Sequence, residues 1–435
     1  MASPTYPVVH GGIGSSPQAP PRRPSTRNAA ASAVLRLGKR YRHAEIRSRR
    51  GNLWTLKAAL VAPARAAREA LAGVRSYGRV TADHSSISTT RQAAWLWWLN
   101  LRHQYSSTEV YRYRLFSWRR ALGRPGFLQW SEAALLYRTV VPQFASGAAE
   151  ILADKRRFSA WCDDKGLASP PILAQFENGR MTGSTVGSGQ PPATDLFAKW
   201  GTQYGGEATL RWHRVEDGWE DDDGRAWSFH QIMESLAERS HRGVVILQPR
   251  LVNHDDLRPL SPNALSTLRI MTTQRPGREP QYLAGVLRMG TGRSTADNFA
   301  QGGIASPVDP GSGTTGIARS IDDEHRTHVH EVHPDTGVAI AGRRVPFWRE
   351  SVSLALRAHA LLGPIPCVGW DVAVLADGPV LLEGNWNPCT KLLQVATQTP
   401  LLHTEFARAF ADWLAQPGCR IDDQWLLDHA TWSPV

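Results

Sequence analysis

The sequence predicts an α+β fold in which helices and antiparallel strands alternate irregularly. Three observations support this prediction. Apolar and polar residues alternate on both sides of the turn at 376–378, which indicates an antiparallel hairpin. Helical patterns at 347–362 and 403–416 lie among strand patterns without the regular rhythm of a parallel sheet. The length of 435 residues exceeds the usual size of one hydrophobic core, so we expect more than one domain.

The excess positive charge is concentrated at one end of the chain. Residues 1–80 contain 15 Lys and Arg against 2 Asp and Glu, and the remainder is nearly neutral. The formal net charge of +11 therefore describes a basic arm, so we expect no nucleic-acid partner from charge alone. Hydrophobic residues make up 42% of the chain and charged residues 20%, values typical of a globular protein.

The sequence predicts a cytoplasmic protein. The first residues contain no apolar segment behind a basic one, so we expect neither a secretory nor a twin-arginine signal. No apolar stretch is long enough to predict a transmembrane helix. The 4 cysteines have no CxxC spacing, which disfavours a structural zinc site or a disulfide framework and favours a reducing compartment.

The N-terminal third divides into a tail and a helical region. Residues 1–30 are rich in Pro, Ser and Ala and are expected to be a disordered tail, and residues 31–145 to be basic, aromatic and helical. The helical pattern is expected to be interrupted at Pro63 and to end at Gly73. This helix either packs its Leu/Ala stripe on the body or makes peripheral contact with anionic lipid at the inner membrane face. The aromatics of 92–150 are interpreted as a helical core rather than as a base-stacking surface.

The body is predicted to contain two lobes, at 146–260 and 261–418, followed by a tail at 419–435. A helix at 151–166 should end at Gly166 and lead into a strand bounded by prolines. A loop rich in Gly, Ser and Pro follows at 183–192. Further strands are predicted at 195–200, 244–252, 267–273, 281–289 and 370–385, where the last range is the hairpin.

The hairpin carries the strongest chemical signal. Asp371 lies on its first strand, and Glu383 and Asn385 lie two residues apart on its second, so the latter two share a face. Two carboxylates and an amide within a Val/Leu-rich hairpin are costly unless a cation neutralises them. Oxygen ligands of this kind suit Mg²⁺ or Mn²⁺ bound to phosphates. The alternative is a surface hairpin with unrelated polar residues.

A second signal indicates phosphate binding. Lys199 ends a predicted strand and is followed by a loop that contains Gly205 and Gly206. A lysine that faces such a loop can neutralise phosphate charge while backbone amides approach the oxygens. The pattern matches neither the Walker nor the Rossmann motif, and a solvated lysine before a glycine turn stays an alternative.

Taken in order, these segments resemble the ATP-grasp superfamily, and most closely its sugar-transfer associated branch. The motifs are ADK, FAKWGTQYGGEA, LQPRLVNHD, LRMGTGRSTADNFAQGGI, HPDTG, PFW and GWDVAV…LLEGNWNP, within residues 145–415. The resemblance implies an ATP-grasp fold, in which two α+β lobes grip ATP, here with a basic helical N-terminal extension. ATP and Mg²⁺, or Mn²⁺, are the implied cofactors.

The resemblance also implies a role for each matching residue. Lys155 and Lys199 would hold the ATP phosphates, and Asp371, Glu383 and Asn385 would bind two Mg²⁺ ions. The hinge would read adenine through Gln248, Arg250 and Leu251, and Asp255 would meet the ribose hydroxyls; Gln248 stands where glutamate is common.

The transferring phosphate would meet further residues of the second lobe. Arg288 would approach the γ-phosphate with Asn298 close by, and the loop Thr291–Gly303 would be a lid. Arg269 is either part of this site or a structural partner.

The implied reaction is an ATP-dependent carboxylate–amine ligation through an acylphosphate. The substrate is expected to be a cell-surface polysaccharide precursor or a small amino acid, with an unidentified amine acceptor. Two alternatives stay open: an ATP-grasp kinase that phosphorylates a hydroxyl, and a non-catalytic protein that binds membrane or nucleic acid. The run from His325 to His333 also leaves open whether it binds a metal.

Overall fold

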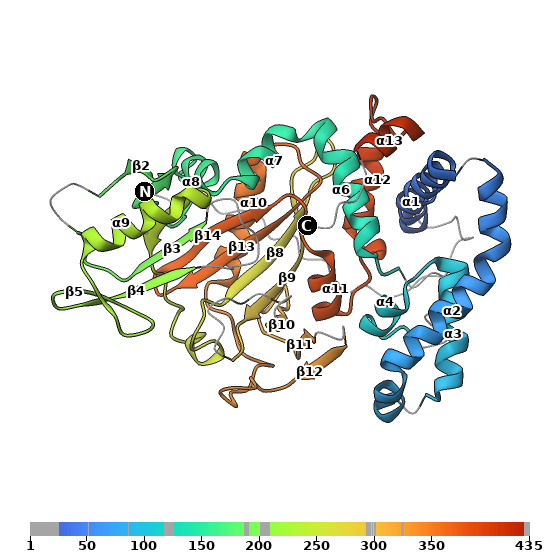
Figure 1. The fold of residues 1–435 in the computed structure, drawn as a ribbon, viewed down its shortest axis with the longest axis horizontal. Helices are drawn as coiled ribbons and strands as arrows, with labels where there is room; N and C mark the ends of the chain where they lie inside the picture. The colour runs from blue at the N-terminus through green and yellow to red at the C-terminus, as the bar shows by residue number, and fades with distance from the viewer. Residues whose placement is uncertain are drawn as a thin grey trace, which may run out of the picture.

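The chain folds into two α+β lobes and a helical N-terminal region. The structure is a computed structural model that describes residues 26–50, 52–85, 87–116, 126–186, 191–200, 209–292, 297, 299, 302–322 and 326–429. The helical region lies at one end of the molecule, the second lobe in the middle and the first lobe at the other end (Figure 1). The α+β prediction and the helical N-terminal region are confirmed. None of the helices in the described ranges has the length and apolar character needed to cross a membrane.

The helical region packs on the body through its apolar faces. Val34 and Leu37 of the first helix are buried in one core with residues of the second lobe. Tyr111 and Tyr113 join this core, which confirms the prediction of an aromatic helical core. Trp97 and Trp98, in contrast, are exposed. The helices are α1 (Thr26–Arg50), α2 (Asn52–Ser85), α3 (Thr89–His103), α4 (Ser107–Arg112) and α6 (Trp130–Phe144).

The predicted breaks at Pro63 and Gly73 are wrong, because α2 continues through both positions to Ser85. A proline removes one helical hydrogen bond but leaves the next turns able to form theirs. Gly73 is required by packing: a Cβ atom there would lie 2.4 Å from Cβ of Ser107. The glycine therefore allows α4 to approach α2 closely and does not end the helix.

The first lobe is an antiparallel sheet covered by one helix. Its strand order is β2-β1-β7-β3-β4-β5-β6, and Ile232 and Leu236 of α9 (Phe229–Arg239) pack against it. Asp154 divides the single helix predicted at 151–166 in two, because its side chain accepts a hydrogen bond from the Arg156 amide at 2.8 Å and so caps the second helix. The elements are α7 (Ser146–Ala153), α8 (Lys155–Asp164), β1 (Ala174–Glu177), β2 (Arg180–Ser184), β3 (Leu196–Trp200), β4 (Leu210–Val215), β5 (Gly218–Asp221), β6 (Ala226–Trp227) and β7 (Val245–Pro249).

The second lobe is built on a second antiparallel sheet, of order β12-β11-β10-β9-β8-β13-β14. The strands predicted at 267–273 and 281–289 are confirmed, as is the hairpin. The elements are β8 (Thr267–Thr273), β9 (Gln281–Met289), β10 (Ile304–Pro307), β11 (Ala318–Ile321), β12 (Thr327–His330), α10 (Trp348–Leu362), β13 (Cys367–Leu375), β14 (Gly378–Asn385), α11 (Thr390–Thr397), α12 (Glu405–Leu414) and α13 (Asp423–His429).

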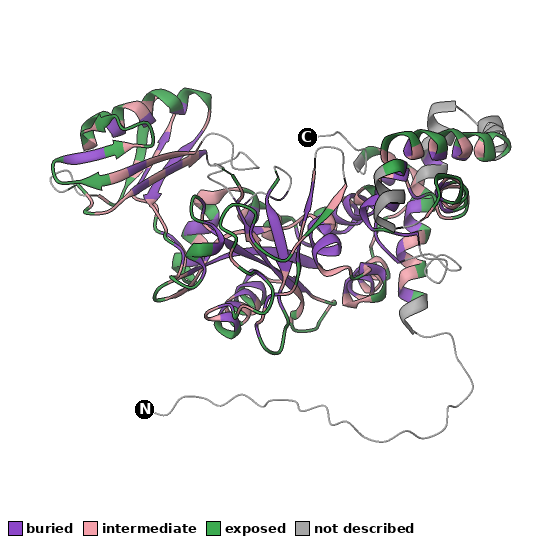
Figure 2. Cartoon of the chain, turned by 90° about the horizontal axis from the view of Figure 1, so that it is seen from below, coloured by how far each residue is buried: buried purple, intermediate pink, exposed green. Residues whose placement is uncertain are grey.

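The two faces of the second sheet bury different cores. Its central strands are largely buried and are purple in Figure 2. Ile270 and Trp370 lie on the face that packs against α10. Met271, Val286 and Cys367 lie on the opposite face, in the core that α11 shares with α6 and the rest of the helical region. Since side chains alternate along a strand, this second face continues toward Arg269 and Asp371. The helical region thus covers one end of the face whose other end is polar.

Gly73 provides a test of the contact between α2 and α4. Alanine normally stabilises a helix interior by about 1 kcal/mol relative to glycine. Gly73→Ala should nevertheless lower the free energy of unfolding by about 1–3 kcal/mol, because the added methyl group overpacks against Ser107. Gly147→Ala in α7 is the matched control, since nothing lies within 4 Å of its added Cβ, and it should be neutral or stabilising. Urea denaturation measures both; equal stabilisation by the two changes would contradict the close contact.

Candidate functional site

A row of polar side chains crosses four strands of the second sheet on one face. Arg269 of β8 lies directly opposite Asp371 of β13, and Asp371 lies opposite Glu383 of β14. Arg288 of β9 lies opposite Thr267, two residues from Arg269 on β8. Because residues two apart share a face, the antiparallel register brings these side chains together.

Asp371 is buried and held by two arginines. Arg269 donates through Nε to Oδ1 and through Nη2 to Oδ2, the latter at 2.9 Å. Arg288 donates through Nη1 to Oδ2 at 3.0 Å. Burial acts to raise the pKa of Asp371, but the two guanidinium groups and a hydrogen bond with Glu383 outweigh it, so the pKa lies below its usual value. Asp371 is therefore charged at neutral pH, and this pairing forms the centre of the site.

Arg288 also holds the segment that precedes the predicted lid residue Asn298. Its Nη2 donates to Asp297 Oδ1 at 2.7 Å, and its Nε to the Asp297 carbonyl at 3.3 Å. Thr267 donates its hydroxyl to the other carboxylate oxygen of Asp297. Burial raises the pKa of Asp297 despite the favourable effect of Arg288. Arg288 thus bridges two buried carboxylates.

Glu383 and Asn385 form the more open part of the row. The Glu383 side chain is 34% exposed, and its Oε2 lies 4.0 Å from Nζ of Lys155. Asn385 donates through Nδ2 to Glu383 Oε1 at 3.4 Å and to the Gly369 carbonyl at 3.3 Å. Lys155 is the first residue of α8, where the helix dipole disfavours a cation. The proximity of Glu383 offsets that disadvantage and draws Lys155 toward the site.

Lys199 reaches the same site from the first lobe. It lies on β3 opposite Ile246 and is partly buried. Burial lowers its pKa to about 8, although the charges of Glu383 and Asp371 act to raise it, and Lys155 lowers it further. Lys199 is therefore under the electrostatic influence of the same Glu383 carboxylate that lies 4.0 Å from Nζ of Lys155.

The residues of the predicted hinge differ in burial and in their hydrogen-bond partners. Gln248 on β7 is buried and donates through Nε2 to the Pro170 carbonyl at 3.1 Å. Arg250 contacts Asp195 at 3.4 Å and His213 at 2.8 Å, and Leu251 follows it, partly buried. Arg250 and Leu251 follow β7 without a break.

Asp255 lies farther along this segment. Its side chain is exposed and pairs with Arg258 at 2.7 Å. The Asp255 carboxylate is therefore directed toward Arg258.

Some predicted residues cannot be placed. Gly205, Gly206, Asn298 and His325 lie outside the described residues. The other members of the histidine run each have a protein partner: His328 contacts Asp322, His330 contacts Ser320 and His333 contacts the Gly290 carbonyl. In the part of the chain that the structure describes, no three His, Cys, Asp or Glu side chains converge as a metal site would require.

The donor set nevertheless fits one hard cation. Glu383 and Asn385 provide a carboxylate and an amide carbonyl, which are oxygen ligands suited to Mg²⁺. Asp371 and Glu383 are directly opposed carboxylates, so a proton or a cation between them relieves their repulsion. Three of the roughly four lone-pair positions of Asp371 accept arginine hydrogen bonds. Asp371 is therefore a weaker candidate for a Mg²⁺ ligand than the sequence implied.

Three residues that matter here were not identified as site residues from the sequence. The sequence leaves open whether Arg269 belongs to the site or is a structural partner, and the structure places it directly against Asp371. Thr267 and Asp297 were not singled out. Thr267 and Arg269 share a face of one predicted strand, and this shared face is the feature of the sequence that could identify them as site residues. Asp297 lies in a loop, and no periodicity indicates where a loop residue will be placed.

A comparison with protein families found one match. Residues 223–408 match the model described as "Sugar-transfer associated ATP-grasp". This match confirms the resemblance that the sequence motifs indicated. The matched range contains Arg288, Asp371, Glu383 and Asn385, and it leaves Lys155 and Lys199 outside. No curated protein matches the chain in sequence.

Several solved structures resemble the chain at low identity. A biotin carboxylase from Campylobacter jejuni has 10% identity and a TM-score of 0.37, over 63% of this chain and 49% of that one. An L-amino acid ligase from Bacillus licheniformis has 11% identity and a TM-score of 0.34, over 61% and 49%. A D-alanine-D-alanine ligase from Coxiella burnetii has 9% identity and a TM-score of 0.34, over 61% and 59%. The match spans about half of each of these solved structures.

The environment of Lys199 predicts an unusually reactive amine. Its labelling by an acylating reagent should show a midpoint near pH 8, because burial lowers its pKa to about 8. Glu383→Gln should move this midpoint downward, since the carboxylate favours the charged ammonium form. Exposed Lys165 is the reference amine. Peptide mass spectrometry measures both lysines; identical pH profiles would contradict the burial of Lys199 beside the site.

Proposed function

Because residues 223–408 match the sugar-transfer associated ATP-grasp family, we propose that this protein is an ATP-dependent carboxylate–amine ligase. The observation that supports the proposal most is the convergence of two lysines and two arginines on two opposed carboxylates where the lobes meet. Such a cluster binds a polyanion together with a cation, which is the chemical form of Mg-ATP.

Each cationic residue has a role in this proposal. Lys155 and Lys199 hold the ATP phosphates from the first-lobe side, where they already face Glu383. Arg288 contacts the transferring phosphoryl group, and Asn298 lies in the segment just after its partner Asp297. Arg269 positions Asp371 rather than contacting substrate.

Nucleotide recognition is assigned to the hinge. The backbone from Gln248 to Leu251, with Arg250 between them, binds adenine, and Asp255 turns from Arg258 to the ribose. Gly205 and Gly206 complete the phosphate loop.

Magnesium would be held by Glu383 and Asn385, with Asp371 contributing its remaining lone pair. The ion, or Mn²⁺ in its place, supplies neutralisation of the phosphate charge when bound. Around it, the protein orients the carboxylate substrate against the γ-phosphate and excludes water as residues 291–303 close.

The proposed chemistry proceeds in two displacements. A carboxylate oxygen of the substrate attacks the γ-phosphorus, the bond to the bridging β–γ oxygen breaks, and ADP leaves. An amine then attacks the acyl carbon of the acylphosphate, phosphate leaves, and the amine loses a proton to give an amide. Lys199 and Arg288 stabilise the charge on the phosphoryl oxygens during the first step.

The substrate class and the location are further parts of the proposal. The sugar-transfer association of the matched family supports a cell-surface polysaccharide precursor, and a small amino acid is the other candidate acid. We place the protein in the cytoplasm, with residues 1–80 in peripheral contact with the anionic inner membrane face. The charge of that region, 15 basic against 2 acidic residues, supports the contact.

Trapping the intermediate tests the reaction. The protein is incubated with Mg-ATP, a panel of sugar acids and amino acids, and hydroxylamine, and both ADP and hydroxamate are measured. A ligase should form hydroxamate with at least one acid in proportion to ADP. Formation of a phosphorylated hydroxyl without hydroxamate would instead establish a kinase and overturn the proposal.

Glu383→Gln tests whether the candidate site carries out the reaction. The substitution should reduce hydroxamate formation about 100-fold or more, roughly 2.7 kcal/mol, because a metal-binding charge is lost while the amide keeps the shape. Glu405→Gln, at the start of the distant helix α12, is the matched control and should retain activity. Equal activity of the two variants would remove Glu383 from the reaction.

A further inference from the structure

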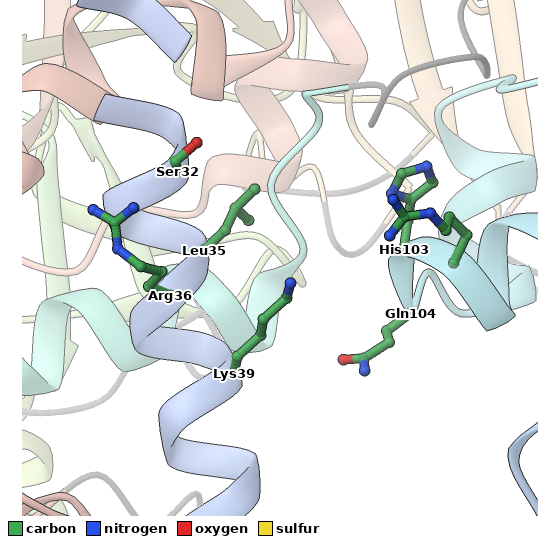
Figure 3. A pocket seen from close by; sticks show the side chains of 7 residues that line it. Ser32, Leu35, Arg36, Lys39, His103 and Gln104 are labelled. Carbon is green, nitrogen blue, oxygen red and sulfur yellow. The ribbon is translucent and has the colours of Figure 1, made fainter. Parts of the chain in front are cut away.

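A cavity of about 230 Å³ lies between α1 and the C-terminal end of α3 (Figure 3). It belongs to the helical N-terminal region, and none of its lining residues is part of the ATP site. The lining residues are Ser32, Leu35, Arg36, Lys39, Arg102, His103 and Gln104. No aspartate or glutamate is among them.

Within the part of the chain that the structure describes, three basic side chains around this cavity are not paired with a carboxylate. Within the described ranges, no hydrogen bond or ion pair engages Arg36, Lys39 or Arg102. The neighbouring Arg40 differs, because it pairs with Asp423 at 3.4 Å. Like charges that gather without a counter-charge repel one another, so an anion in the cavity would stabilise this arrangement.

The helix dipole favours the positive charge on only one of the two sides of the cavity. Arg102 and His103 lie in the last turn of α3, where partial negative charge favours a cation. Arg36 and Lys39 lie in the interior of α1, which runs from Thr26 to Arg50, where the dipole gives no such advantage. In Figure 3 the Lys39 ammonium extends from α1 into the gap that separates it from His103. Charge from both helices therefore meets at the cavity.

We propose that this cavity binds a phosphate group, carried either by a soluble phosphate ester or by a lipid headgroup. Arginine and lysine are the side chains best suited to phosphate, which has more oxygens and more charge than a carboxylate. Gln104 adds a neutral hydrogen-bond donor, and Leu35 provides an apolar wall. The volume is below the roughly 300–1,000 Å³ typical of whole-ligand pockets, so the phosphate enters while its substituent stays outside. The inference is independent of the ligase proposal.

Protection of Lys39 from chemical labelling provides a direct test. The full-length protein is labelled with an amine-reactive reagent with and without inorganic pyrophosphate, at constant ionic strength so that screening is equal. We expect labelling of Lys39 to fall at least fivefold at saturating pyrophosphate and that of exposed Lys165 to stay unchanged. Absence of protection, or equal protection of both lysines, would overturn the proposal. Because Lys39 itself is read out, pyrophosphate bound elsewhere does not affect the result.

Vesicles identify the source of the phosphate. The same labelling is repeated with phosphatidylcholine vesicles that contain phosphatidic acid and with vesicles of phosphatidylcholine alone. Protection of Lys39 by phosphatidic acid in addition to protection by pyrophosphate identifies a lipid headgroup as ligand and supports the membrane contact of residues 1–80. Protection by pyrophosphate without protection by vesicles identifies a soluble phosphate ester. Either result supports a phosphate site.

A matched pair of double variants tests whether the protection of Lys39 requires the cavity or only positive charge in general. Arg36→Gln combined with Arg102→Gln should abolish the protection of Lys39 by pyrophosphate. Arg68→Gln combined with Arg75→Gln removes the same charge from the exposed face of α2 and should leave the protection intact. All four arginines are exposed, so both variants should fold, which their thermal denaturation verifies. Equal loss in both variants, or retained protection in the cavity variant, would refute a specific site.

Discussion

The buried ionic cluster of Arg269, Asp371 and Arg288 is the interaction on which the candidate site depends. Removing charged groups from water costs several kcal/mol for each ion, so the cluster exists only because every charge has a close partner. The antiparallel register of β9, β8 and β13 supplies that proximity by placing the three side chains on one face. Arg288 extends the cluster to Asp297, which lies within residues 291–303, the range proposed as a lid.

The remainder of the molecule is arranged around this polar face. The same face becomes apolar toward Met271 and Cys367, where α11 and the helical region, including α6, bury it. Tyr137 of α6 donates to the Pro388 carbonyl at 3.1 Å, just beyond Asn385. The helical region therefore supports the segment that follows the candidate metal ligands. On the other side, Lys155 and Lys199 bring the first lobe to the open edge of the cluster.

Periodicity was sufficient to predict the strands that carry the site. The strands at 267–273 and 281–289 and the hairpin at 370–385 are buried and regular, so their alternation was visible in the sequence. It could not reveal that Arg269 and Arg288 neutralise Asp371, because cross-strand register depends on turns and bulges far along the chain. The helix end expected at Gly73 failed for a related reason: tertiary packing against α4 overrides local propensity.

The central claim is that Arg269 and Asp371 stabilise each other within the fold, and a double-mutant cycle tests it most directly. Arg269→Met, Asp371→Asn and the double variant are compared by hydrogen exchange of the β13 amides, which reports the free energy of local opening. Each single change leaves a buried charge less compensated and should lower that free energy by roughly 3–5 kcal/mol. The double variant should lose less than the sum, with a coupling of about 1–3 kcal/mol. Additive effects would contradict the account.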